Sequence, residues 1–158
     1  MIADFQLIHY KVDELSFKMY PGLELVMYDG PISDGLSFQF EAATPTYFKS
    51  QGVYIVGLKL IIKLSNKPPD QDHETEFLNL SCSLAGAFRF NTAEVDPTTL
   101  QAFLKLNELT VLLPYLRSVV TTLLATGGFG AIRFPLFNMT KVSKDLFGDE
   151  DIEIEIAE

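Results

Sequence analysis

The chain has 158 residues, of which 47% are hydrophobic, and a formal net charge of −9 at pH 7. This length suits one domain with a substantial core, and the apolar content excludes an intrinsically disordered chain. The acidic balance disfavours proteins that bind nucleic acid or anionic membranes through a basic surface, and it favours basic partners. Cys82 is the only cysteine, so no intrachain disulfide can form and we expect a reduced, cytoplasmic environment.

Alternating apolar positions predict two long strands in the middle of the chain. Between residues 53 and 64 the even positions are apolar, whereas Lys59 and Lys63 lie on the odd face, which is typical of a half-buried strand. The alternation resumes over residues 78–90 after a polar loop, so we expect a long antiparallel hairpin. Cys82 falls on the apolar face of the second strand and is expected in the core.

Two earlier segments, residues 4–18 and 36–42, are also strand-like, and the second places Phe38 and Phe40 on one face. Four strands are therefore predicted. The connection between these two segments contains prolines and glycines among apolar residues, which is typical of an irregular loop.

Helical spacing replaces the strand pattern in the second half. Asp96 is a candidate N-cap with Pro97 at the first helical position, and Pro114 is predicted to open a second helix that Gly127 and the next glycine end. A last helix is expected at about residues 138–147. Strands followed by helices predict an α+β fold, with a four-stranded antiparallel sheet and the helices packed on one face.

The last residues differ from the rest, so we divide the chain into a domain at residues 1–147 and an acidic tail at residues 148–158. The tail alternates isoleucines with acids, and we expect it to be flexible and solubilising; an edge strand or a partner contact is the alternative. No apolar run approaches the ~20 residues that span a bilayer, and the N-terminus does not resemble a signal peptide, so neither membrane insertion nor secretion is expected.

The sequence offers little for catalysis. His9 and His73 are the only histidines, and neither has a sequence partner that would make it a recognisable general base. There is no nucleophile elbow, zinc signature or phosphate loop, and the carboxylates of residues 70–76 lack the glycine turn and final glutamate of a calcium loop. We expect a protein that is not an enzyme and needs no cofactor or metal.

Two loops are too apolar for ordinary connections. One contains Met27 and Tyr28, and the other contains Phe129, Phe134 and Phe137. Exposed apolar surface usually marks a binding site, so these loops are predicted to form a groove if both flank the second helix. The alternative is that they cap the core.

Several segments together resemble the SecB family of export chaperones. The resemblance rests on residues 112–117 (LLPYLR), 127–129 (GGF) and 134–138 (FPLFN) in that order, with 5–17 and 74–78 resembling the family's first and third strands. It covers roughly residues 5–147 and implies a four-stranded antiparallel sheet with helices on one side. It also implies a homotetramer built as a dimer of dimers.

The resemblance further implies an ATP-independent holdase that binds unfolded polypeptides or preproteins in an apolar groove. The groove would lie between the loop at residues 20–35 and the helix at residues 114–125. Methionine and aromatic side chains suit such a promiscuous surface because they adapt to many partner shapes. The residues expected to line it are Leu23, Met27, Tyr28, Tyr115, Val119, Phe129 and Phe137.

Family members dock the SecA motor through acidic positions on the sheet. Glu14 keeps one of these acids and is the candidate contact, but Lys18 replaces another, and the third-strand acid is replaced near Leu80 or Ser81. These departures weaken the expectation of a SecA partner. Two alternatives stay open: a SecB-like chaperone dedicated to one client such as an antitoxin, and a binding module for a small apolar ligand.

Overall fold

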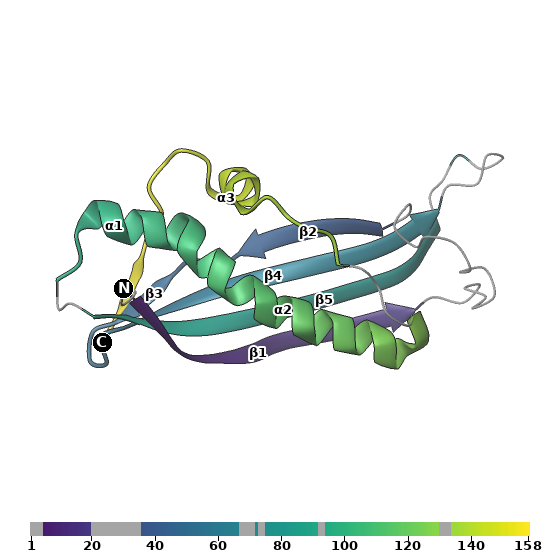
Figure 1. Cartoon of the computed structure of the whole chain (residues 1–158), viewed down its shortest axis with the longest axis horizontal. Helices are drawn as coiled ribbons and strands as arrows, with labels where there is room; N and C mark the ends of the chain where they lie inside the picture. The colour runs from purple at the N-terminus through teal and green to yellow at the C-terminus, as the bar shows by residue number, and fades with distance from the viewer. Residues whose placement is uncertain (1–4, 20–35, 67–71, 73–74, 92–93, 130–133) are drawn as a thin grey trace.

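The described residues form six strands and a long helical segment (Figure 1). The computed structural model describes residues 5–19, 36–66, 72, 75–91, 94–129 and 134–158. The strands are β1 (Phe5–Met19), β2 (Leu36–Ala42), β3 (Thr46–Phe48), β4 (Val53–Asn66), β5 (Thr75–Phe90) and β6 (Glu155–Ala157). The helical elements are α1 (Pro97–Ala102), a short π-helix (Phe103–Asn107), α2 (Glu108–Leu124), a second short π-helix (Ala125–Phe129) and α3 (Met139–Phe147).

All six strands belong to one sheet, in which β1, β5, β4, β3 and β6 are neighbours in that order and β2 also pairs with β4. Every pairing is antiparallel except that of β3 with β6, which is parallel. The predicted α+β fold and antiparallel sheet are confirmed. The predicted count of four strands is wrong, because β3 and β6 have only three residues each, too few to show a period of two.

Two bulges in β1 decide which of its side chains face the helices. The register with β5 shifts at Ile8 and again at Asp13, and each extra residue switches the parity of the strand. As a result, apolar side chains stay on the helix-covered face although they are not evenly spaced in the sequence. The β1 residues opposite the buried face of β5 are Phe5, Leu7, Tyr10, Val12, Leu15, Phe17 and Met19.

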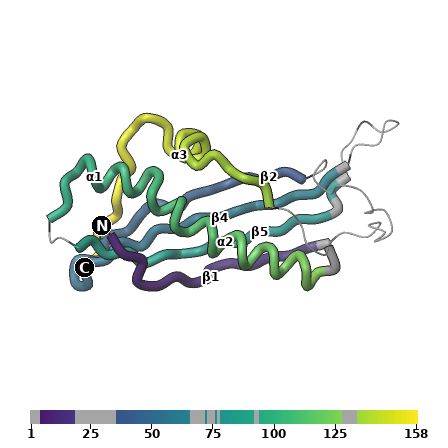
Figure 2. Tube along the Cα trace, viewed as in Figure 1, coloured from purple at the N-terminus to yellow at the C-terminus, as the bar shows by residue number. Residues whose placement is uncertain are grey.

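The helical segment from Pro97 to Phe129 runs without interruption obliquely across the sheet (Figure 2). Asp96 caps it as predicted, since its carboxylate accepts a hydrogen bond from the Thr99 N–H at 3.2 Å. The prediction that Pro114 opens a new helix is wrong. Pro114 lies inside α2 on its exposed face, so the carbonyl of Thr110, which loses its usual N–H donor, faces solvent.

The predicted helix stop at Gly127 is also wrong, because the helical segment continues to Phe129. Gly127 instead allows the helical segment to pack closely against Phe17 of β1. A Cβ at position 127 would lie 2.6 Å from the Cζ atom of Phe17, so only glycine lets this turn approach β1 so closely.

Residues 97–127 are long and apolar enough to cross a membrane, judged by length and composition alone. The expectation that no apolar stretch approaches the length of a bilayer span is therefore wrong, because the two predicted helices are joined into one segment. In this fold the apolar side of the segment packs on the sheet. Its buried leucines include Leu104, Leu109, Leu112, Leu116 and Leu124.

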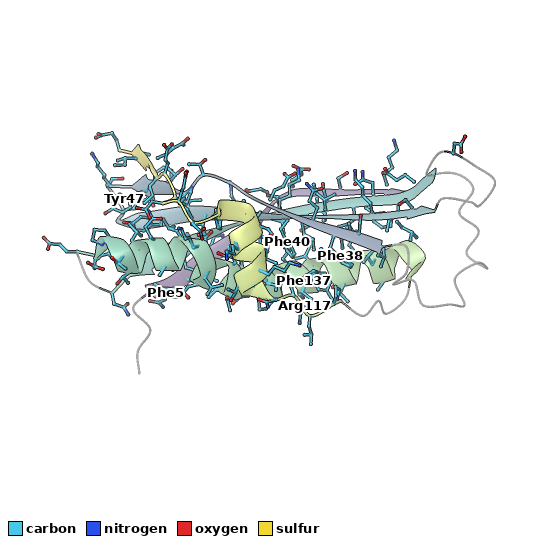
Figure 3. All side chains as sticks on the ribbon, turned by 90° about the horizontal axis from the view of Figure 1, so that it is seen from above. Phe5, Phe38, Phe40, Tyr47, Arg117 and Phe137 are labelled. Carbon is cyan, nitrogen blue, oxygen red and sulfur yellow. The ribbon has the colours of Figure 1, made fainter. Side chains whose placement is uncertain are left out.

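The core lies between this helical segment and one face of the sheet. The even-numbered face of β4 and the apolar face of β5 are buried as the alternation predicts, with Leu58, Leu60 and Cys82 fully enclosed. Figure 3 shows the sheet edge-on, with the helices on one side and polar side chains projecting from the other. We call the second side the open face.

The segment after α3 returns to the sheet. Residues Glu155–Ala157 pair in parallel with Thr46–Phe48, and Ile152 and Ile154 pack against the core. Of the alternatives predicted for the acidic tail, the structure contains the edge strand.

Candidate functional site

An aromatic cluster joins β2 to the segment that precedes α3. The ring of Phe137 lies edge-on to the rings of Phe38 and Phe40, with centroid separations of 5.5 and 4.9 Å. Phe134 completes the cluster, at 5.7 Å from Phe38 and 5.5 Å from Phe137. Edge-to-face pairs of this kind stabilise a fixed arrangement of rings. The labelled rings of β2 and Phe137 lie beside α3 in Figure 3.

Helix α3 lies beside this aromatic cluster, and its two ends are set by local sequence. The Asn138 side chain accepts a hydrogen bond from the Lys141 N–H at 3.2 Å and so begins the helix, while Gly148 ends it with a positive φ of 65°. The predicted last helix is confirmed. Val142 and Leu146 recur at i and i+4, so they share one side of the helix and face the aromatic rings.

Between β2 and α3 lies a cavity of about 400 Å³, which we call the α3 cleft. Such a volume is within the usual range of ligand-binding pockets. Its rim carries Lys141 and Asp145, whereas Leu136 beside it has 92% of its surface exposed. The residues that line the cleft are Phe38, Gln39, Phe40, Leu136, Phe137, Asn138, Lys141, Val142, Asp145 and Leu146.

Arg117 of α2 contacts the aromatic cluster through Phe134. Its guanidinium carbon lies 5.4 Å from the centre of the Phe134 ring, a distance typical of cation–π contacts. Figure 3 shows Arg117 near the labelled rings of the cluster. Within the described residues its buried Nε atom has no hydrogen-bond partner. The guanidinium thus helps to fix an aromatic ring that packs directly on Phe137.

A second apolar surface lies at the other edge of the sheet, along β1. The rings of Tyr10 and Tyr115 lie 4.3 Å apart between centroids, which ties this edge to α2. Four large apolar residues of β1 are between 38% and 49% exposed. We call this the β1-edge surface and define it by Ile8, Tyr10, Val12, Leu15 and Tyr115.

Next to Leu15 the β1-edge surface is hollowed. A cavity of about 350 Å³ opens between the strand and the exposed side of α2. Thr122 and Thr126 turn their hydroxyls back to the carbonyls of Ser118 and Thr122, at 2.9 and 2.8 Å, so these side chains present mainly methyl groups. The lining residues are Leu15, Ser118, Val119, Thr122, Leu123 and Thr126.

The structure separates the predicted groove residues that it describes. Phe137 lies in the α3 cleft, whereas Tyr115 and Val119 lie at the β1-edge surface. β5 and β4 stand between β1 and β2 in the sheet, so these residues do not meet in one groove. Three further predicted residues, Leu23, Met27 and Tyr28, lie outside the described residues, and of Phe129 only the backbone is described.

The sequence prediction missed most of the cleft, although signals for it exist. The sequence predicts Phe38 and Phe40 on one face of a strand, but no sequence pattern connects that strand with Phe137. The i, i+4 pair of Val142 and Leu146 is an amphipathic signal in a helix whose other positions are mostly polar. Leu136 has no periodic partner and is recognisable only as a large apolar residue beside a proline.

Glu14, the candidate motor contact, lies on the open face of the sheet. Its Oε1 atom accepts a hydrogen bond from the Ser81 hydroxyl at 3.0 Å and lies 3.5 Å from the Lys59 ammonium. Half of the Glu14 side chain remains exposed. The charge of this carboxylate is thus partly compensated within the chain.

The electrostatics of the core are dominated by Glu108, which begins α2. The residue is 2% exposed, and its Oε2 atom has no hydrogen-bond partner among the described residues. Burial raises the pKa of this carboxyl to about 9, because a charge is disfavoured in apolar surroundings. The side chain is therefore a neutral acid at physiological pH, and it lines neither apolar surface.

Comparisons with known proteins show a similarity to solved structures. Neither protein-family models nor curated proteins match this chain. Among solved structures it is similar to the SecB-like chaperone of Mycobacterium tuberculosis in complex with a ChAD peptide from an antitoxin. The TM-score is 0.59 at 15% identity, and the match covers 85% of this chain and 91% of that one. A protein of unknown function from Streptococcus agalactiae matches with a TM-score of 0.39 at 11% identity, over 84% and 97% of the two chains.

The chain therefore has a SecB-like fold, and the resemblance predicted from the sequence is confirmed at the level of the fold. The predicted sheet with helices on one face is the shared feature. At this identity the likeness concerns the fold alone, so the site rests on the residues of this chain.

Proposed function

We propose that the protein is an ATP-independent holdase chaperone that binds unfolded or non-native polypeptides in the α3 cleft. The observation that carries the proposal is an open apolar cleft walled by Phe38, Phe40 and Phe137 beside a leucine that is almost fully exposed. Exposed apolar surface of this kind is a hallmark of binding sites. The SecB-like fold supports the proposal, since the mycobacterial neighbour is a chaperone in complex with a peptide.

Binding in this cleft needs no catalytic group. An apolar client side chain that enters the space between β2 and α3 would leave water, which stabilises the complex by roughly 1.5–3 kcal/mol per fully buried side chain. Lys141 and Asp145 at the rim offer a donor and acceptors to the client backbone. The net charge of −9 adds a general attraction for basic clients.

The β1-edge surface is, in this proposal, the place where copies of the chain assemble. Among the described strands, the 15-residue strand β1 lies at one edge of the sheet and pairs with β5, and an edge strand of this length is suited to pairing with another chain. The exposed side of α2 next to it carries uncharged residues such as Thr110, Tyr115, Ser118 and Thr122. Pairing β1 with its copy and stacking α2 with its copy would give the dimer of dimers expected from the SecB resemblance.

A dedicated chaperone for one antitoxin is a second candidate. The observation that favours it is the ChAD peptide from an antitoxin in the complex of the mycobacterial neighbour. The same cleft would serve, with higher selectivity for one sequence. A small apolar ligand is the third possibility, because a cavity of about 400 Å³ accommodates one.

We propose a cytoplasmic location, which suits a chain whose single cysteine, Cys82, can form no intrachain disulfide. Preproteins are among the proposed clients, so a role in export is part of the proposal. SecA is not proposed as a partner. The reason is that Glu14, the candidate contact, is already engaged by Lys59 and Ser81.

Site-specific photo-crosslinking tests where a client binds. A photoreactive residue replaces Leu136 at the cleft and, as a control, Lys11 on the open face, whose side chain is 68% exposed. With a reduced and alkylated client, the probe at position 136 is expected to crosslink strongly and the probe at position 11 weakly, and the native client should give little product at either. Equal yields from both positions would contradict binding in the cleft.

A further inference from the structure

The C-terminal segment is held by contacts that do not depend on its being part of the same chain. The Gln101 side chain in α1 meets the backbone of Ile152 with two hydrogen bonds: its Nε2 donates to the Ile152 carbonyl at 3.0 Å, and its Oε1 accepts from the Ile152 N–H at 2.8 Å. An amide side chain that satisfies both backbone groups of one residue acts like a neighbouring strand. It recognises an extended backbone without regard to sequence.

On the other side, the segment adds to the free edge of β3. The Glu155 N–H donates to the Pro45 carbonyl at 2.9 Å, and the Lys49 N–H donates to the Ala157 carbonyl at 3.0 Å. The strand formed in this way has only three residues. Addition of a short strand to an exposed sheet edge is a common way to recognise peptides.

Side-chain contacts give this arrangement its selectivity. Ile152 and Ile154 pack against the core, whereas Ile156 is 64% exposed. The acids between them point to solvent, and Lys105 reaches the Asp149 carbonyl at 3.4 Å. The β3 edge and the facing side of α1 thus fit an extended segment with two aliphatic residues separated by one polar residue.

We propose that the β3 edge and the facing side of α1 form a second polypeptide-binding seat, which the chain's own residues 149–157 occupy and which an equivalent aliphatic–acidic strand from a second copy can enter by exchange. Among the described residues, this site and the α3 cleft have no lining residue in common. The inference therefore goes beyond the proposed function and does not rest on it. The tethered segment acts as a built-in competitor at high effective concentration.

Gly148 makes such an exchange physically simple. It ends α3 with a φ of 65°, and no Cβ contact would arise there, so the chain turns at this point without packing constraints. The segment that follows bears acids at residues 149, 150 and 151, which keep the connection solvated. Release of the strand would leave α3 and the cleft in place.

The test uses the full chain and a fluorescent peptide of residues 148–158. In the variant Ile152→Asn/Ile154→Asn the attached strand is weakened, so the peptide is expected to bind at least about tenfold more tightly than to the wild type, whose seat is occupied. The variant Ile156→Asn is the matched control, because the same change at an exposed position should leave binding at the wild-type level. Circular dichroism verifies that each variant is folded.

A second measurement covers the case in which the double variant does not fold. A protease site is inserted after Gly148 in the full chain, which is folded first and then cleaved. Native mass spectrometry with excess isotope-labelled peptide should show replacement of the cleaved segment. The proposal is overturned if folded double variant and wild type bind the peptide equally or not at all, or if the cleaved chain incorporates no labelled peptide. These outcomes leave client binding in the α3 cleft untouched.

Discussion

The ring of Tyr115 in α2 lies against the ring of Tyr10 in β1, with centroids 4.3 Å apart and an angle of 35° between the planes. Both rings remain partly exposed, at 36% and 38%. The pair therefore joins an edge strand and a helix into one apolar surface. It also shows that Tyr115 lies at the sheet edge opposite the α3 cleft.

If this surface holds copies of the chain together, a charge placed on both tyrosines should separate them. We expect the double variant Tyr10→Glu/Tyr115→Glu to sediment as a smaller species than the wild type, because burying two carboxylates at an interface is strongly unfavourable. Lys11→Glu on the opposite face of β1 is the control and should leave the mass unchanged. Analytical ultracentrifugation checks the prediction, and an unaltered mass for the double variant would contradict it.

Glu108 should make the stability depend on pH. The pKa of its carboxyl is raised from 4.5 to about 9 in the folded chain, so the folded state keeps a proton that the unfolded state releases above pH 4.5. The free energy of unfolding should therefore fall as pH rises from about 5 to 9, by about 1 kcal/mol per pH unit.

Glu108→Gln should flatten this dependence and raise stability at pH 8, because an amide does not ionise. Urea unfolding at a series of pH values measures both effects. Glu150→Gln removes an exposed carboxylate instead and should behave as the wild type. Parallel pH profiles for Glu108→Gln and the wild type would refute the assignment of a buried neutral acid.

Gly86 of β5 lies directly beneath Leu112 of α2, with no room for a side chain. A Cβ at this position would lie 2.8 Å from Leu112 Cδ2 and 2.8 Å from Phe88 Cε2. Gly86→Ala should therefore destabilise the fold by about 1–3 kcal/mol through overpacking. Thermal or urea unfolding gives the value, Ser83→Ala on the open face serves as the control, and a Gly86→Ala variant as stable as the wild type would argue against this packing.

Much of the fold could be predicted because long elements carry their own signals. The alternation over β4 and β5 reflects burial of one face, and the bounds of β2 agree with the prediction. Asp96 and Asn138 cap helices through local hydrogen bonds, which depend on neighbours three residues away. The SecB resemblance added the expected arrangement of these elements.

The parts that failed depend on contacts distant in sequence. The bulges at Ile8 and Asp13 are set by pairing with β5, and Pro114 stays helical because the surrounding helix packs on the sheet. The groove prediction as a whole stays a prediction, but two of its described residues lie at different edges of the sheet: Tyr115 contacts β1 and Phe137 contacts β2. No local sequence pattern indicates which strands will lie between two apolar segments in the folded sheet.

Light scattering from a chemically unfolded client, without ATP, tests the central claim most directly. The wild type should suppress aggregation at near-stoichiometric amounts. Leu136→Asp should lose most of this effect, because it places a charge at the cleft on a residue whose side chain is already exposed, while Ile156→Asp, an equally drastic change at another exposed site, should keep it. No suppression by the folded wild type, or equal suppression by both variants, would contradict a holdase that works through the α3 cleft.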